Sequence, residues 1–211
     1  MVTFLAGKRI RGTNTDVSLT TVDSTAQTGQ DSGGTITSNS NREGQVFSTG
    51  QTEIGRIPIR VKFKLAKTGS PTGTLSCKIR NSADTVQFTS PTTIDISTLT
   101  GTHTEYTFEL NTNTYALANG DRITLEPSGG TVDGSNYINI GSKSAAGLAN
   151  SEHQTYQSST WSTYSAGYDL YIRVDSIISV NDTFQDGTIF EAIDTNKHYI
   201  FNSTTTLWTL V

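Results

Sequence analysis

The segment that decides the fold is W-S-T-Y-S-A-G-Y-D-L-Y-I-R-V, residues 161–174. Its second half alternates between an apolar and a polar set, Leu170, Ile172 and Val174 against Asp169, Tyr171 and Arg173. A period of two residues indicates a strand with one face in the core and the other turned away from it. The first half gathers aromatic residues among Ser, Thr and Gly, as a loop does. We therefore expect a core strand and a candidate contact surface in one segment.

The same alternation recurs upstream of this segment. Residues 60–65, 75–80, 105–110 and 123–125 each set apolar side chains against polar or charged ones, and a further apolar pair follows at 138–140. Gly, Pro, Asn and Asp cluster between these segments, as they do in turns. No segment carries the sustained apolar stripe of an amphipathic helix. The sequence therefore predicts an all-β protein in which two sheets pack as a sandwich.

Changes in residue composition and apolar pattern divide the chain into three regions. Residues 1–45 form an N-terminal arm or the first strands, and strands at Gly34–Thr37 and Gln45–Ser48 are one interpretation. A disordered leader and an arm that orders against a neighbouring subunit are the alternatives. Residues 46–175 form the sandwich. Residues 176–211 form a small three-stranded meander, which is too short to bury a core alone and must pack on the sandwich or on copies of itself.

Several sequence segments suggest a more specific fold. The likeness extends over roughly residues 46–174 and is carried by five segments: Ile57–Leu65, Gly69–Ile79, Thr104–Leu110, Asn119–Leu125 and Gly167–Val174. In pattern and order they resemble a jelly-roll domain like those of carbohydrate-binding modules, which occur in secreted bacterial proteins and virus structural proteins. The phrase F-E-A-I-D-T-N-K-H-Y-I-F, residues 190–201, is similar to short C-terminal β-modules of phage and archaeal-virus structural proteins. The resemblance implies a jelly-roll topology and a place in a virus particle.

Charge and cysteine content restrict the partners. The formal net charge is -4 at pH 7, which argues against nucleic acid as the main partner because phosphate binding needs a basic face. The single cysteine, Cys77, alternates with Leu75 and Ile79, so we expect a buried and inert thiol. No stretch reaches membrane-spanning length, and the first residues lack the pattern of a secretory signal peptide. These features favour a location on a virion or another extracellular surface, on a particle assembled inside its host.

Four aromatic residues form the first candidate site: Tyr156, Trp161, Tyr164 and Tyr168. Sugar-binding modules stack pyranose rings on such side chains, while nearby Asn, Asp and Ser bond the hydroxyls. The alternative is that these residues cap one end of the sandwich or fill a subunit interface. We favour the interface.

Five basic residues form the second candidate site, a basic docking face: Arg60, Lys62, Lys64, Lys78 and Arg80. One interpretation is cross-strand pairing with acidic residues on neighbouring strands, for which Glu105, Glu109 and Glu126 are candidates. The other is docking of an acidic neighbouring subunit. Nucleic acid is disfavoured because aromatic residues do not alternate with these positions.

No pattern indicates catalysis, a cofactor or a metal. The histidines at positions 103, 153 and 198 lack the spacing of zinc ligands, and no contiguous loop of acidic residues suits calcium. No Gly-x-Ser-x-Gly elbow is present, and no pair of carboxylates is marked by its surroundings. We therefore expect a protein that is not an enzyme.

These observations together predict a structural protein of a virus particle, such as a capsid decoration, fibre or tail-associated subunit. Its expected partners are other copies of itself and other virion proteins, with surface glycans as a further contact. A carbohydrate-binding module of a cell-surface protein is one alternative. A cellular filament subunit that donates its N-terminal arm to a neighbour is another.

Overall fold

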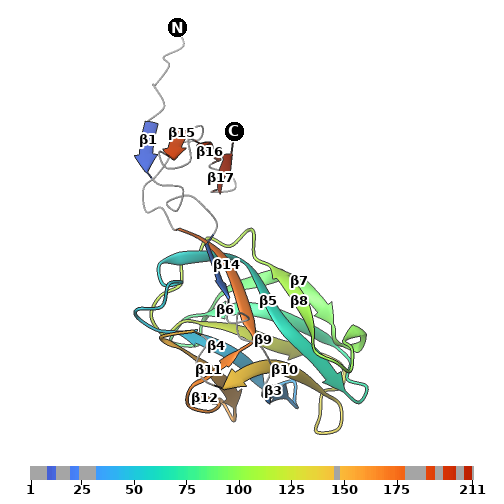
Figure 1. Cartoon of the computed structure of the whole chain (residues 1–211). Coiled ribbons are helices and arrows are strands. Elements are labelled where there is room, and N and C mark those ends of the chain that lie inside the picture. Colours follow the sequence, from blue (N-terminus) through green and yellow to red (C-terminus); the bar gives the residue numbers. More distant parts are fainter. Residues whose placement is uncertain are drawn as a thin grey trace. The chain divides into compact units, whose positions relative to one another are not determined.

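The computed structural model is all-β (Figure 1). It describes residues 9–12, 20–23, 32–144, 148–178, 189–192, 197–202 and 207–210. Within these ranges, turns connect the strands, and η3 (Ile96–Thr98) is a single 3-10 turn. Asp95 caps this turn, because its side chain accepts a hydrogen bond from the backbone amide of Ser97. The same ranges contain no helix that is long and apolar enough to span a membrane.

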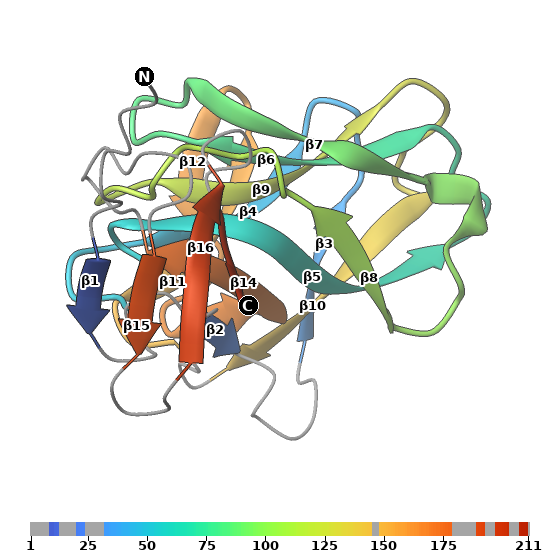
Figure 2. The same ribbon diagram turned by 90° about the horizontal axis from the view of Figure 1, so that it is seen from above.

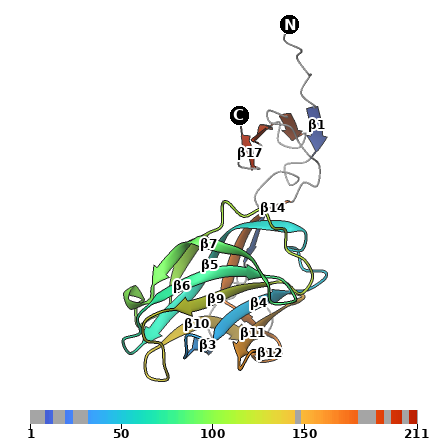
Figure 3. The ribbon, with the colours of Figure 1, turned by 180° about the vertical axis from the view of Figure 1, so that it is seen from behind.

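One layer of the sandwich is a six-stranded antiparallel sheet. Its strands lie in the order β12 (Thr160–Thr163), β11 (Ser151–Gln157), β4 (Arg42–Phe47), β9 (Arg122–Ser128), β6 (Thr74–Arg80) and β7 (Val86–Asp95). Figure 3 shows β6, β9, β4 and β11 side by side in this layer. Because neighbouring strands come from distant parts of the sequence, the sheet brings widely separated side chains onto one face.

The second layer is a seven-stranded sheet. Its main path is β13 (Tyr168–Leu170), β10 (Tyr137–Ser144), β5 (Arg56–Thr68), β14 (Ile172–Ile178) and β2 (Thr20–Asp23). Two further strands extend it, because β3 (Ser32–Ile36) pairs with β10 and β8 (Thr104–Glu109) pairs with β5, both antiparallel. The predicted all-β class and two-sheet sandwich are confirmed, while the jelly-roll topology stays a prediction.

The hydrophobic core lies between the two sheets and follows the alternation of the sequence. On β6, Leu75, Cys77 and Ile79 are fully buried, as their period of two predicts. Phe63 on β5 and Phe108 on β8 meet edge to face, with ring centroids 6.2 Å apart. Burial raises the pKa of the Cys77 thiol well above its usual range, so the thiol stays protonated. This agrees with the buried and inert cysteine that the sequence predicts.

The opening segment agrees with its prediction at the apolar positions and differs at Asp169. Leu170, Ile172 and Val174 are buried, but the Asp169 side chain is buried as well. The strict alternation fails because β13 ends at Leu170 and also contacts β4 and β11 of the other sheet, so both of its faces are covered. The Asp169 carboxylate accepts hydrogen bonds from the Leu148 amide, at 2.9 Å, and from the Gln45 side chain. Its charge is therefore satisfied inside the protein.

A separate four-stranded sheet forms from the segments before and after the sandwich. Strands β15 (Ile189–Ala192), β16 (Lys197–Asn202) and β17 (Leu207–Leu210) form an antiparallel meander, as predicted. Strand β1 (Arg9–Gly12) pairs in parallel with β15, so that Arg9 lies opposite Ile189. Figure 2 shows β1, β15 and β16 side by side. The sequence pattern gives no sign of this pairing between the first and last strands.

The chain thus forms two units with boundaries that differ from those expected. Residues 1–20 and 177–211 make up one unit, and residues 21–176 make up the sandwich. The expected N-terminal region of residues 1–45 is divided between them, because β1 joins the meander while β3 and β4 are sandwich strands. The interpretation of strands near residues 34–37 and 45–48 is confirmed by β3 and β4. The connections between β15, β16 and β17 lie outside the described residues.

Candidate functional site

The strongest candidate site is the outward face of the six-stranded sheet around Trp161. Strand pairing places Trp161 of β12 opposite Tyr156 of β11, and Tyr156 opposite Arg42 of β4. The Tyr156 and Trp161 rings tilt at 57° with centroids 5.2 Å apart. The Arg42 guanidinium carbon lies 4.2 Å from the centre of the Tyr156 ring, within the range of a cation–π contact. One cross-strand row therefore holds two aromatic rings and a cation.

Contacts on several sides fix the Trp161 side chain. Its indole Nε1 donates a hydrogen bond of 2.8 Å to Asp84 Oδ1. The Arg122 guanidinium carbon lies 5.1 Å from the centre of the ring. Gly44 of β4 makes room for the indole, because a Cβ at this position would lie 3.3 Å from the ring atom Cη2 of Trp161. The ring is held in one orientation before any ligand arrives, which lowers the entropic cost of binding.

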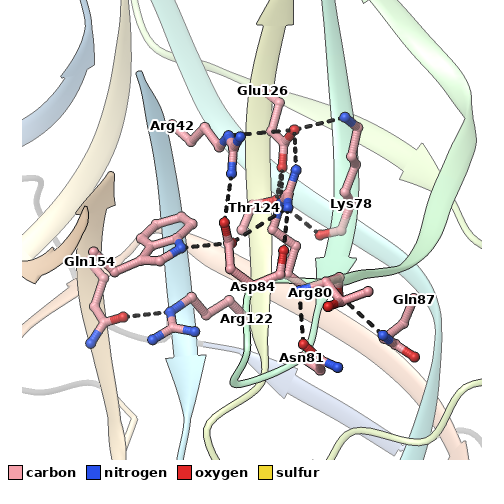
Figure 4. Close-up of polar contacts among 12 residues, drawn as sticks. Arg42, Lys78, Arg80, Asn81, Asp84, Gln87, Arg122, Thr124, Glu126 and Gln154 are labelled. Carbon is pink, nitrogen blue, oxygen red and sulfur yellow. Dashed lines mark hydrogen bonds and ion pairs between the residues drawn. The ribbon is translucent and has the colours of Figure 1, made fainter. Parts of the chain in front are cut away.

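Asp84 organises this arrangement from the turn between β6 and β7. Its backbone has a φ of 64°, in the left-handed region that aspartate tolerates better than most residues. This conformation allows its carboxylate to accept from both Trp161 and Arg42, the latter at 3.2 Å. Its backbone carbonyl accepts from Arg80 at 2.6 Å. One turn residue thus joins Trp161 to two cations of the sheet. Figure 4 shows Asp84 with Arg42 and Arg80.

Next to this turn, the Glu126 carboxylate of β9 contacts several cationic side chains. Its carboxylate accepts from Arg80 Nε at 2.6 Å and from Lys78 Nζ at 2.7 Å (Figure 4). Arg42 Nε lies 3.8 Å away. Burial alone would raise the pKa of Glu126, but the hydrogen bonds and charges of Arg80 and Lys78 outweigh burial and lower the pKa to about 2. Glu126 therefore stays ionised and is not suited to act as a general acid.

Arg122 differs from the other cations of this face. Its Nε donates to Gln154 Oε1 at 2.7 Å, and its Nη1 donates to the Gly120 carbonyl at 3.4 Å. Both acceptors are neutral. Among the described residues no carboxylate lies within ion-pair distance of Arg122, whereas Arg42, Lys78 and Arg80 each have at least one. We call Arg42, Arg122, Gln154, Tyr156 and Trp161 together the Trp161 face.

The four predicted aromatic residues do not form one cluster. Ring contacts join Tyr156 to Trp161 and Tyr164 to Tyr168, the second pair with centroids 5.8 Å apart. The Tyr164 hydroxyl donates to the Gly33 carbonyl at 3.1 Å, and its ring stacks on His153 at 4.4 Å. The second pair therefore covers one part of the sandwich, while the first lies on the sheet face.

Beneath Tyr164 lies a buried pair that the sequence pattern does not reveal. His153 Nε2 of β11 and Glu43 Oε2 of β4 are 2.6 Å apart. Burial raises the pKa of Glu43, and the hydrogen bond and charge of His153 offset part of this shift. Gly34 of β3 makes room for the pair, because a Cβ there would lie 2.8 Å from His153 Cε1. The pair thus joins neighbouring strands of the six-stranded sheet and lies against β3 of the other sheet, which indicates a structural role.

The predicted basic residues lie on two different sheets. Lys78 and Arg80 belong to β6 of the six-stranded sheet, and Arg60, Lys62 and Lys64 belong to β5 of the seven-stranded sheet. This corrects the single basic face that the sequence led us to expect, because β5 and β6 are consecutive strands that pass from one layer to the other. The structure also places aromatic rings in the same network as Lys78 and Arg80, where we had expected none.

The structure agrees with the interpretation that these cations pair with acidic residues on neighbouring strands. Arg60 Nε lies 3.1 Å from Glu109 Oε1, and Lys62 Nζ lies 2.8 Å from Glu105 Oε1. Lys64 Nζ lies 4.1 Å from the centre of the Tyr171 ring. The third acidic candidate, Glu126, accepts from Lys78 and Arg80 as described above. Within the described ranges, no group of three or more His, Cys, Asp or Glu side chains could hold a metal ion.

Comparisons with known proteins add little to this description. No protein-family model and no curated protein matches the sequence significantly. Two solved structures of Cwp84 are similar over 69% of this chain at 12% identity. One is the clostridial cysteine protease Cwp84 after propeptide cleavage, with a TM-score of 0.42 and 38% of its chain covered. The other contains the cysteine protease and lectin-like domains of Cwp84, a surface layer associated protein of Clostridium difficile, with a TM-score of 0.39 and 34% covered. These low scores carry no functional argument.

Proposed function

We propose that the protein is a non-enzymatic structural protein of a virus particle, in which one unit assembles and the other contacts surface glycans. The observation that carries this proposal is the division of the chain. Strand β1 precedes the sandwich and β15–β17 follow it, yet these strands form one sheet, while residues 21–176 form the sandwich. In a virion subunit, one such unit would attach to neighbouring subunits and the other would present a contact surface.

The four-stranded sheet is suited to assembly. Four short strands bury little apolar surface by themselves, so packing against other copies or other virion proteins would stabilise the sheet. In the order of this sheet, β1 and β17 are the outer strands. An outer strand presents backbone amides and carbonyls that a strand of a neighbouring subunit can pair with. The similarity of residues 190–201 to terminal β-modules of virus structural proteins supports the same role.

The sandwich is suited to surface contact. The Trp161 face presents two partly exposed rings and a guanidinium group on a rigid sheet, and rings of this kind stack on sugars. The same observation favours the second candidate function, a carbohydrate-binding module of a cell-surface protein. The two candidates differ in assembly, because the module would bind glycans as a monomer.

The oligomeric state of the full chain tests the proposal. Light scattering coupled to size-exclusion chromatography should give a mass of several subunits that rises with protein concentration. Ile200→Pro should lower this mass to that of one subunit. Ile200 lies in the middle of β16, between β15 and β17, so proline removes a backbone hydrogen bond to one neighbour.

A matched control separates assembly from general unfolding. Val86→Thr changes an exposed residue of β7 in the sandwich and should leave the mass unchanged. The sandwich of the Ile200→Pro variant should still unfold cooperatively on heating. A wild-type protein that remains monomeric at every concentration, or that binds glycans as a monomer, would contradict the virion proposal and favour the binding module.

A further inference from the structure

The starting observation is an arginine that lacks an acidic partner among its described neighbours. Arg122 is half-buried and donates only to the neutral oxygens of Gln154 and Gly120. A guanidinium group carries five N–H donors, so further donors remain after these two bonds. Burial lowers the pKa of Arg122, while the charges of Asp84 and Asp121 raise it, and burial dominates. Within the described part of the chain, the protein thus holds a partly desolvated positive charge with no carboxylate in ion-pair contact.

The surroundings of Arg122 show where an incoming anion would lie. Trp161 is beneath its guanidinium carbon at 5.1 Å, and Tyr156 is next to Trp161. Gln154 uses its Oε1 on Arg122, which leaves its NH2 group as a donor toward a ligand. An unpaired cation, an amide donor and two aromatic rings therefore meet on one surface.

We propose that the Trp161 face binds acidic saccharides, with the sugar carboxylate on Arg122 and the sugar ring on Trp161 and Tyr156. This inference rests on the glycan contact proposed above and names its chemical class. A planar guanidinium suits a carboxylate because two parallel N–H donors meet its two oxygens. The face of a sugar ring carries C–H groups that pack on an aromatic ring.

A saccharide fits this face better than a nucleic acid does. A polynucleotide carries a phosphate on every residue and needs a row of available cations. On this sheet Asp84 and Glu126 already pair with Arg42, Lys78 and Arg80, so Arg122 alone lacks an acidic partner in the described part of the chain. The net charge of the chain, -4, further opposes a polyanion. One available cation matches one carboxylate on one sugar.

Calorimetric titration of the full chain tests the proposal with matched ligands. The first pair is trigalacturonic acid and its fully methyl-esterified form, in which each carboxylate is replaced by an uncharged methyl ester. The second pair is sialyllactose and lactose, which distinguishes a sialic acid from a uronic acid as the source of the carboxylate. The acidic member should bind at least about tenfold more tightly than its neutral partner, because its carboxylate adds a charge-assisted hydrogen bond. Tenfold corresponds to about 1.4 kcal/mol.

Three variants identify the group that recognises the charge. Arg122→Gln should remove the preference for the acidic ligand, and Arg122→Lys should keep part of it, because lysine retains the charge but not the two parallel donors. Arg60→Gln removes the same charge from the opposite sheet and should bind like the wild type. Thermal unfolding of each variant checks that the sandwich is intact, and Arg122→Lys serves as the readout if Arg122→Gln fails to fold.

The outcomes separate this inference from the proposed function. Equal affinity for the acidic and neutral ligands, or an acidic preference that survives Arg122→Gln, would overturn the inference while the glycan contact stands. Binding of a thymidine oligonucleotide without saccharide binding would overturn it in favour of nucleic acid. No saccharide binding at all would overturn both the inference and the glycan contact, and the light-scattering result would still decide the assembly role.

Discussion

Glu53 offers a sharp test of how the sandwich tolerates a buried charge. The residue lies in the loop after β4 and is fully buried, and neither carboxylate oxygen has a hydrogen-bond partner among the described residues. Burial raises the pKa of Glu53 to about 7 from 4.5. The nearby Ser176 hydroxyl and Arg56 guanidinium offset part of this shift, and the Asp175 carboxylate adds to it. At neutral pH and above, an incompletely solvated charge is therefore held inside the protein.

The sign and size of the effect follow from the difference between the folded and unfolded pKa. Between the unfolded value of 4.5 and about 7 the folded protein retains a proton that the unfolded chain has released. The stabilising contribution of protonated Glu53 is therefore complete below pH 4.5 and is lost as the pH rises through about 7. A difference of roughly 2.5 pKa units corresponds to about 3 kcal/mol. Glu53→Gln imitates the protonated side chain, so the variant should escape this loss.

Urea unfolding of the wild type and of Glu53→Gln, followed by tryptophan fluorescence at pH 5 and pH 8, measures the effect. The two proteins should have similar free energies of unfolding at pH 5. At pH 8 the variant should be more stable by about 3 kcal/mol. Because every other titrating group is shared, the difference between the proteins isolates Glu53. An equal pH dependence in both proteins would refute the reasoning, since Glu53 would then not titrate in this range.

Two further predictions concern the site and the core. Asp84→Ala should destabilise the protein by about 1–3 kcal/mol and shift the Trp161 fluorescence, because the indole loses its acceptor. Asp84→Asn should destabilise the protein less, because asparagine tolerates the φ of 64° and keeps an acceptor oxygen. Equal losses in the two variants on urea unfolding would show that the indole hydrogen bond contributes nothing. Phe63→Ala should lower the free energy of unfolding by about 3–5 kcal/mol, because it leaves a cavity and deprives Phe108 of its partner. Phe63→Leu should lower the free energy of unfolding less. A loss of less than about 1 kcal/mol for Phe63→Ala in the same assay would contradict the assignment of this residue to the core.

The strands and the core were predictable because each depends on local alternation. The apolar positions of residues 75–79 and 170–174 lie on the buried face, and Glu105 pairs with Lys62 as the cross-strand interpretation expected. A period of two residues determines which side of a strand is buried, and this information is contained within a few residues. It does not determine which sheet a strand joins, which is why Lys62 and Lys78 were placed on one face.

The candidate site was only partly predictable for the same reason. Tyr156 and Trp161 were recognised as aromatic residues in polar surroundings, but nothing local connects Trp161 to Asp84, which lies 77 positions earlier in the chain. The pair of Glu43 and His153 spans 110 positions. Such contacts depend on the order of strands in a sheet, and that order follows from the packing of the whole domain. The pairing of β1 with β15 was missed because four residues give too short a pattern to recognise.

The central claim is that the Trp161 face is the contact surface of the sandwich, and nuclear magnetic resonance tests it most directly. Two-dimensional spectra of the ¹⁵N-labelled full chain contain one signal for the indole Nε1–H of Trp161, which Trp161→Phe identifies. During titration with trigalacturonic acid, this signal and the side-chain NH2 signals of Gln154 should shift saturably, while the amide signals of β5 should stay in place. Shifts confined to β5 or to the four-stranded sheet, or no shifts at all, would contradict the account.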